Sequence, residues 1–235
     1  MTLAKGKPFK PDWNGKGEIL LVDKPEEWTS FDVVKKVRSL FRIGKIGHAG
    51  TLDPKATGLL ILCTGPRTKS VTRFMELEKV YLGTMELGIS TASFDMETPI
   101  LARRSIEGVS EELLRSVMAR FTGKQLQVPP MYSAAKFGGK PLYKFARRGR
   151  TVERATKEIS VDLFDLVAFD PPRVQFAVRC SKGTYIRSLV HDVGTELGCG
   201  AVLTALRRTR IGSYDVRDAW TVDELITLKG RPAAA

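Results

Sequence analysis

The sequence predicts an α+β fold with a mixed, mostly antiparallel sheet and flanking helices. Apolar residues alternate in segments 79–89 and 173–181, which is typical of half-buried antiparallel strands, and Leu59–Cys63 predicts a buried strand. Helical spacing after Thr29 and Ser110 predicts helices that pack on the sheet. Strands outnumber the crossover units that a parallel sheet would need, so the antiparallel arrangement is favoured.

In the first part of the chain, a strand at 18–22 ends at Asp23-Lys24-Pro25. Thr29 or Ser30 then caps a helix to about Phe41, with an apolar stripe of Phe31, Val34, Val37 and Phe41, widened by Val33 and Leu40. The opposite side carries Lys35, Lys36, Arg38 and Arg42, as a solvated face or an RNA contact. The buried strand at 59–63, a turn at 65–69, a helix at 71–76 and the strand at 79–89 follow.

The second part of the chain begins with a polar loop at 91–99. The elements expected after it are a helix from 110 to about 121, an irregular basic segment at 125–154, a strand at 159–169 with a bulge at Leu163-Phe164, a strand at 173–181, a helix at 184–197, a second helical piece from 201 to about 209, a short strand at 211–216 and a last helix capped by Thr221.

The charge balance points to a polyanionic partner. The 235 residues include 38 Lys and Arg against 26 Asp and Glu, a net charge of +12. Such an excess favours nucleic acid. A membrane surface is the weaker alternative, because the cations lie among aromatics and turns and not along one amphipathic helix.

Three further observations concern the compartment. No apolar stretch is long enough to span a bilayer, and the N-terminal arm 1–17 lacks the apolar core of a signal peptide. Cys63, Cys180 and Cys199 are far apart and form no CxxC pair, which argues against structural zinc. A reduced, cytoplasmic protein without a metal is therefore expected.

The stretch Gly44–Gly65, GKIGHAGTLDPKATGLLILCTG, organises the chain. Its glycines, including Gly44, Gly47, Gly50 and Gly58, permit positive φ or close packing. Pro54 biases Asp53 toward an extended conformation outside any helix. The segment therefore predicts a carboxylate on a stiff loop at the mouth of a sheet, where chemistry is often placed. The alternative is that Asp53 only forms an Asp-Pro turn.

The segment 125–154 does not have the pattern of a core element. Between Lys136 and Arg154 there are seven Lys and Arg against the single Glu153, interleaved with Tyr132, Phe137, Tyr143 and Phe145. Cations for phosphates and aromatic surfaces for bases are the ingredients of RNA contact. A solvated irregular loop is the alternative.

Several other catalytic motifs are absent. The phosphate-binding pattern G-x-x-x-x-G-K-[ST] and the dinucleotide pattern G-x-G-x-x-G do not occur. The esterase pattern G-x-S-x-G is missing too, and no motif localises a pair of carboxylates for glycoside chemistry.

At GHAGTLDPKATGLL the sequence resembles the pseudouridine synthases, specifically the TruB family of tRNA pseudouridine-55 synthases. Other motifs extend the resemblance in the family order: DKPEEWTSFDVVKKVR, KVYLGTMELG, PPMYSAAKFGGKPLYKFARRGRTVER, CSKGTYIRSLVHDVG and LTALRRTRIG. Together they cover about residues 18 to 220. The resemblance implies the pseudouridine synthase fold.

The resemblance also implies a reaction. The C1′–N1 glycosidic bond of a uridine breaks, the base turns, and it is rejoined through C5, without cofactor, metal or external energy source. Asp53 matches the catalytic aspartate, which attacks C1′ or removes a C2′ proton; both routes remain open. Tyr81 matches the tyrosine under the base. Arg187 matches the arginine that pairs with the aspartate and keeps it ionised.

The remaining site residues follow the same matches. Leu206 corresponds to the apolar residue on the other face of the base, and His48 to the histidine associated with the flipped nucleotides. Lys24 supports the pocket, and Lys69 is a phosphate contact. An RNA-binding insertion, 125–154, would present Lys136, Lys140, Arg147 and Arg148. The expected partner is the tRNA T stem-loop, bound by a monomer without guide RNA or membrane.

The chain departs from the family pattern at two places. Glu27 stands where the first motif usually has Gly, so a turn that needs positive φ would be strained. The expected domains are an arm at 1–17, a catalytic domain at 18–220, and a helix and tail at 221–235, which leave no room for the C-terminal RNA-binding PUA domain of many relatives.

Three functions follow from these observations. The first is guide-independent pseudouridylation of tRNA, by an enzyme that flips the base out of the stack. The second is a non-catalytic tRNA-binding protein that helps tRNA fold and does not need Asp53. The third is a guide-RNA-dependent relative, against which the expected absence of a PUA domain argues.

Overall fold

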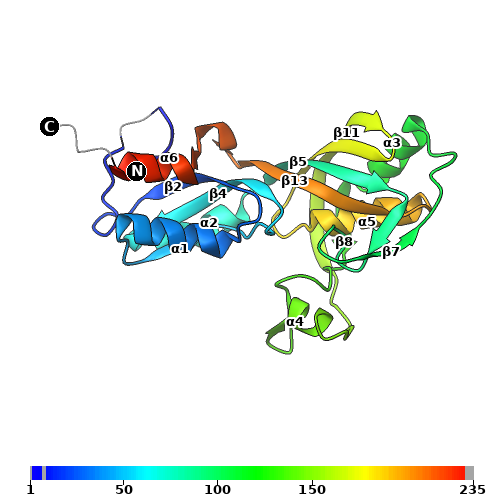
Figure 1. The fold of residues 1–235 in the computed structure, drawn as a ribbon, viewed down its shortest axis with the longest axis horizontal. Coiled ribbons are helices and arrows are strands. Elements are labelled where there is room, and N and C mark those ends of the chain that lie inside the picture. Colours follow the sequence, from blue (N-terminus) through cyan, green and yellow to red (C-terminus); the bar gives the residue numbers. More distant parts are fainter. Residues whose placement is uncertain (1, 7–8, 231–235) are drawn as a thin grey trace. The chain divides into compact units, whose positions relative to one another are not determined.

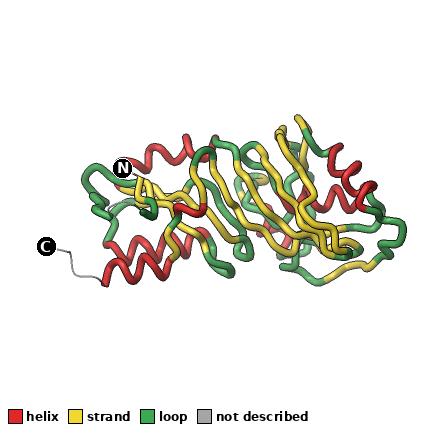
Figure 2. The backbone as a smooth tube through the Cα atoms, turned by 90° about the horizontal axis from the view of Figure 1, so that it is seen from above, coloured by secondary structure: helices red, strands yellow, loops and turns green. Residues whose placement is uncertain are grey.

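A computed structural model describes residues 2–6 and 9–230 of the chain (Figure 1). Parts of the expected arm and tail, at 1, 7–8 and 231–235, lie outside the described residues. The chain forms two compact units: unit 1 comprises the described residues of Met1–Tyr81 and Leu206–Ala235, and unit 2 comprises Leu82–Ala205. Figure 2 shows strands in the centre of each unit and helices beside them. The predicted α+β class is confirmed.

Unit 1 is built on a mixed sheet whose central pair is antiparallel. β2 (Ile19–Lys24) pairs with β4 (Thr57–Thr64) from Ile19↔Cys63 to Lys24↔Gly58. Strand β13 (Ala201–Ile211) runs parallel to β4 through Arg207↔Thr57 and Arg208↔Gly58. Shorter strands complete the sheet: β1 (Thr2–Leu3) and β15 (Trp220–Thr221) on β2, β3 (Ile46–His48) on β4, and β14 (Tyr214–Asp215) on β13.

Both faces of this sheet are apolar and covered, which is why β4 is a continuous hydrophobic run. One face carries Leu20, Val22, Leu60 and Leu62 and packs against α1 (Ser30–Phe41) and α6 (Val222–Gly230). The other face carries Leu21, Leu59 and Ile61 and packs against Phe74 of α2 (Val71–Glu76). The short 3₁₀ helices η1 (Gly65–Ser70) and η2 (Val216–Asp218) connect these elements.

Helix α1 begins where the sequence predicts, but its buried face is rotated. The Thr29 side chain accepts from the Asp32 amide, and Asp32 in turn accepts from the Thr29 amide, which forms a capping box. Val33, Val34 and Val37 face the core. Phe31, which was expected in the apolar stripe, is 68% exposed. At 100° per residue it lies beyond the edge of the stripe that these three valines define.

Unit 2 is organised around a long antiparallel pair. β11 (Lys157–Asp170) lies between β12 (Arg173–Cys180) and β8 (Gly123–Gln127), and the unit 2 part of β5 (Lys79–Leu87) is next to β12. The register of β11 against β12 shifts between Val161 and Leu163 and again between Leu166 and Ala168, so the strand is irregular as predicted, but not at Leu163-Phe164 itself. Strands β6 (Ile89–Thr91) and β7 (Ile100–Arg103) form a hairpin around the loop predicted at 91–99, and the strand at 100–103 is one that the sequence did not predict.

Three helices belong to unit 2: α3 (Glu111–Arg120), α4 (Leu142–Ala146) and α5 (Ile186–Glu196). The expected insertion at 125–154 begins too early, because Gln125–Gln127 pair with β11 as part of β8. The rest of it contains β9 (Lys136–Phe137), β10 (Lys140–Pro141) and α4. Figure 1 shows α4 and its flanking loops projecting from the body of unit 2.

The helical piece expected from 201 to about 209 is wrong. These residues form strand β13, which carries Leu206 and continues to Ile211. Ala, Leu and Arg are strong helix formers, so local propensity favoured a helix. Pairing with β4 and the burial of Val202, Leu203 and Ile211 override that preference.

Glu27 adopts a left-handed conformation with φ of 63°. The side chain is exposed, so no burial compensates for this conformation. For an L-residue it costs about 1–2 kcal/mol, which glycine avoids. The strain anticipated from the sequence at this turn is therefore present.

Replacing Glu27 with Gly is expected to raise the free energy of unfolding by about 0.5–1 kcal/mol, since the relieved strain exceeds the entropy cost of glycine. Urea unfolding of the purified protein measures this. Glu26→Gly is the matched control, because Glu26 is exposed, lacks a positive φ and acts electrostatically on Lys24 as Glu27 does. Equal or greater stabilisation by Glu26→Gly would contradict the interpretation.

Candidate functional site

Asp53 lies on the loop between β3 and β4, and the backbone of this loop is held at several points. The Ala49 amide donates to the Ile61 carbonyl, and the Ala56 amide donates to the Asp53 carbonyl. The buried Ser30 hydroxyl accepts from the Leu52 amide at 2.9 Å and donates to the Leu52 carbonyl at 3.3 Å. The loop is therefore anchored through its backbone, with Asp53 partly exposed on it.

Of the four glycines named above in the stretch Gly44–Gly65, two adopt a positive φ, a conformation that favours glycine. Gly50 has φ of 100° and Gly58 has φ of 103°. A Cβ on Gly58 would lie 2.2 Å from the Arg208 carbonyl oxygen, so β4 and β13 could not approach this closely with any other residue. Gly44 and Gly47 do not have positive φ, and a Cβ there would meet only ordinary contacts.

Lys24 ends β2 and is 0% exposed. Its ammonium group donates to the carbonyls of Pro25 at 2.8 Å, Trp28 at 2.5 Å and Pro54 at 3.0 Å. Burial lowers its pKa to about 8, and the negative charge of Asp53 acts in the opposite direction. Lys24 is thus tied to the residue that follows Asp53, and its role as a support of the pocket stays a prediction.

Of the other residues predicted in unit 1, three lie on strands of its sheet and the fourth, Lys69, lies on a 3₁₀ helix. Tyr81 is buried on β5, and Leu206 is half-buried on β13, the strand adjacent to β5. His48 is half-buried on β3; burial lowers its pKa, and a backbone hydrogen bond with Gly50 opposes that shift. Lys69 is exposed on η1.

Arg187 lies in unit 2, at the start of α5, and is 4% exposed. Its guanidinium donates to the Ser93 carbonyl at 3.1 Å and the Tyr132 carbonyl at 2.9 Å, and it lies 3.4 Å from the Asp95 carboxylate. Asp95 is a residue that the sequence analysis missed. Arg187 and Asp53 belong to different units, so their pairing stays a prediction.

The loop that carries Asp95 contains a strained aromatic residue. Phe94 has φ of 65°, an uncommon conformation for a bulky side chain, and its ring stacks on His191 of α5 at 3.8 Å between centroids. The Leu203 amide donates to the Phe94 carbonyl. Burial lowers the pKa of His191 and raises that of Asp192 to about 6. No local pattern in the sequence marks these long-range contacts.

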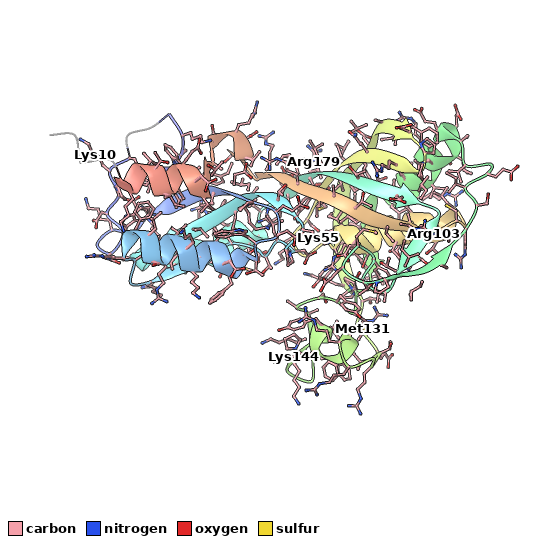
Figure 3. The ribbon with its side chains drawn as sticks, in the orientation of Figure 1. Lys10, Lys55, Arg103, Met131, Lys144 and Arg179 are labelled. Atoms are coloured by element: carbon pink, nitrogen blue, oxygen red, sulfur yellow. The ribbon has the colours of Figure 1, made fainter. Side chains whose placement is uncertain are left out.

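The projecting segment, residues 128–154, presents the predicted RNA-binding residues to solvent. Lys136, Lys140, Arg147 and Arg148 are all exposed. The Arg147 guanidinium lies 5.4 Å from the centre of the Tyr143 ring, and Phe137 packs edge-on against Phe145 at 5.9 Å. In Figure 3, Lys144 lies in this segment and Met131 lies where it leaves the body of unit 2.

Within residues 2–6 and 9–230, no group of three or more His, Cys, Asp or Glu side chains is arranged to hold a metal ion. No helix in the described part of the chain has the length and apolar character needed to cross a membrane.

Comparison with known families covers most of the chain. Residues 38–186 match the TruB family pseudouridylate synthase N-terminal domain, and residues 187–231 match the tRNA pseudouridylate synthase B C-terminal domain rather than a PUA domain. The tRNA pseudouridine synthase B of Opitutus terrae is 48% identical over 89% of this chain and 87% of its own. That of Chlorobaculum tepidum is 44% identical over 89% and 90%.

Solved structures agree with this assignment. A Cbf5-Nop10-Gar1 complex matches with a TM-score of 0.71 and 28% identity over 96% of this chain, and an archaeal box H/ACA sRNP Nop10-Cbf5 complex matches with 0.66 and 28% over 90%. This chain spans 61% and 53% of those two chains. The family matches and the curated relatives together show that the chain belongs to the TruB family of pseudouridylate synthases, which are isomerases.

Proposed function

We propose that this TruB-family enzyme isomerises uridine-55 in the T loop of tRNA to pseudouridine, without a guide RNA. The observation that carries the proposal is the anchored loop with Asp53, next to the buried Lys24. The names of the curated relatives, tRNA pseudouridine synthase B, support tRNA as the substrate.

The chemistry assigned to Asp53 needs an ionised and oriented carboxylate. As a nucleophile it would attack C1′ and release the base, and as a base it would remove the C2′ proton. The charge of Lys24 favours the ionised form, because opposite charges stabilise each other where water is excluded. We propose that Arg187 contributes in the same way.

Access to the reacting atoms requires the uridine to leave its stack. We propose that Tyr81 and Leu206 receive the flipped base, with His48 at the displaced nucleotides and Lys69 at a phosphate. Support comes from the position of Tyr81 and Leu206 on adjacent strands and from the exposed position of Lys69.

The test is incubation of the purified protein with an unmodified tRNA transcript, followed by carbodiimide treatment and primer extension. A stop that reports pseudouridine at position 55 is expected, and none with a transcript that carries cytidine there. Failure of the wild-type protein to form product at position 55 contradicts the proposal. Tight tRNA binding without product would indicate the non-catalytic tRNA-binding alternative.

The contacts with the tRNA phosphates are assigned to the projecting segment. Replacing Lys140, Arg147 and Arg148 together with Gln is expected to weaken tRNA binding and to flatten the dependence of log K on log salt by about 2–3, since each lost phosphate contact removes about 0.7–0.9. Filter binding over a range of salt concentrations measures the slope.

The matched control for this prediction replaces three exposed arginines elsewhere in unit 2, Arg103, Arg173 and Arg179, and removes the same charge. Its slope is expected to change less, because general attraction falls but no assigned phosphate contact is lost. An equal change in both triple variants would show that the binding charge is not localised in the projecting segment.

A further inference from the structure

We infer that Arg208, with Ser30, is a positioning residue for Asp53: it fixes the loop on the N-terminal side of the carboxylate as Lys24 does on the C-terminal side. The inference rests on the proposed function of Asp53. Arg208 is not one of the residues proposed to touch the substrate, which are Tyr81, Leu206, His48 and Lys69.

Arg208 is 1% exposed, although its strand continues to exposed positions on both sides. Burying a guanidinium is costly unless its donors are satisfied. Its Nε donates to the Leu59 carbonyl at 2.8 Å, and its Nη2 donates to the Gly50 carbonyl at 3.1 Å. The side chain therefore crosses β4 and ends on the loop that carries Asp53.

The two cations hold carbonyls on opposite sides of Asp53. Arg208 holds Gly50, three residues before it, and Lys24 holds Pro54, the residue after it. Burial is the main cause of the lowered pKa values of Lys24 and His48, and the charge of Arg208 lowers both further. Between the two anchors, Ser30 fixes both the amide and the carbonyl of Leu52.

One backbone feature and one side-chain feature make the Arg208 anchor specific. The parallel register pairs Arg208 with Gly58, whose lack of a side chain permits the close approach of the two strands. The guanidinium carries several donors in a fixed planar fork, so it can hold two carbonyls of different segments at once. An ammonium group at this position keeps the charge but does not provide this fork.

Kinetics of Arg208→Lys provide the first test. With tRNA saturating, the single-turnover rate constant is expected to fall about 10-fold to 100-fold, because a misplacement of about 1 Å at a catalytic group has effects of this size. The Kd for tRNA should stay within about 2-fold, since the charge is kept and the contact is buried. Ser30→Ala is expected to lower the same rate constant without changing the Kd.

Arg207→Lys is the matched control. It makes the same substitution on the neighbouring residue, whose guanidinium pairs with Asp23 at 2.6 Å and donates to the Thr57 hydroxyl of β4 at 3.4 Å. Its rate constant should stay near that of the wild type. An unchanged rate constant in Arg208→Lys, or an equal loss in both lysine variants, overturns the inference, even where thermal stability falls.

A second measurement separates this inference from the proposed function. Amide hydrogen exchange of the loop peptide 49–56 is expected to be at least about 10-fold faster in Arg208→Lys than in Arg207→Lys, because local opening becomes easier when an anchor is lost. If the wild type forms no pseudouridine at position 55, the proposed function fails while exchange still decides the anchoring. Equal exchange in the two variants refutes the anchoring.

Discussion

Replacement of Asp53 with Asn is expected to lower the rate of pseudouridine formation by about 10⁴-fold or more, as the loss of a central catalytic group does in other enzymes. Affinity for tRNA should change by less than about 3-fold. The amide keeps the size and shape of the side chain, so the anchors on the loop remain. It lacks the negative charge that either route for Asp53 requires.

The measurement is a single-turnover assay with saturating tRNA, beside filter binding of the same preparation. Asp223→Asn serves as the control. Asp223 lies in the first turn of α6, and its substitution makes the same change of charge in the same unit. The control should retain the wild-type rate. Full product with Asp53→Asn would remove Asp53 from its assigned role, whereas loss of tRNA binding would indicate a different effect on the protein.

The elements that could be predicted from the sequence are those whose signals are local. The capping box at Thr29 and Asp32 fixes the start of α1, and the apolar run of β4 reflects a sheet covered on both faces. The position of Asp53 on an anchored loop follows from its glycines and from Pro54. At Glu27 a single departure from a family motif was enough to anticipate positive φ.

What could not be predicted depends on contacts between distant segments. The helix expected at 201–209 is a strand, because pairing with β4 outweighs the propensity of its residues. Arg208 looked like one cation among several in LRRTR until its burial and its carbonyl partners were known. Asp95 meets Arg187 across a separation of 92 residues in the chain, so no spacing rule connects them.

Replacement of Lys24 with Met is expected to have the largest effect on stability, a loss of about 2–4 kcal/mol in the free energy of unfolding. Methionine fills a similar volume but leaves the carbonyls of Pro25, Trp28 and Pro54 without their donor. Asp53 would also lose a nearby positive charge.

Urea unfolding near neutral pH measures this loss, with Lys35→Met as the control. Lys35 is exposed on α1, so the same substitution there is expected to change the free energy by less than about 0.5 kcal/mol. A loss in Lys24→Met no larger than in the control would mean that the three hydrogen bonds contribute little to the folded state.

The pH dependence of the difference between wild type and Lys24→Met reports on the burial of the charge. In the folded protein burial lowers the pKa of Lys24 to about 8, while the unfolded chain has the ordinary value of 10.5. Between these values the unfolded state binds more protons, so the contribution of Lys24 to stability increases with rising pH and is lost as pH falls through about 8.

The stability difference between the two proteins should therefore widen between about pH 8 and 10.5, provided both remain folded. Taking the difference between the free energies of unfolding of the two proteins cancels the contributions of groups that titrate in the same way in both. A difference that stays constant over this range would mean that the three carbonyls and the Asp53 carboxylate fully offset burial. Lys24 would then keep its ordinary pKa and stay mostly charged beside Asp53 until the pH approaches 10.5.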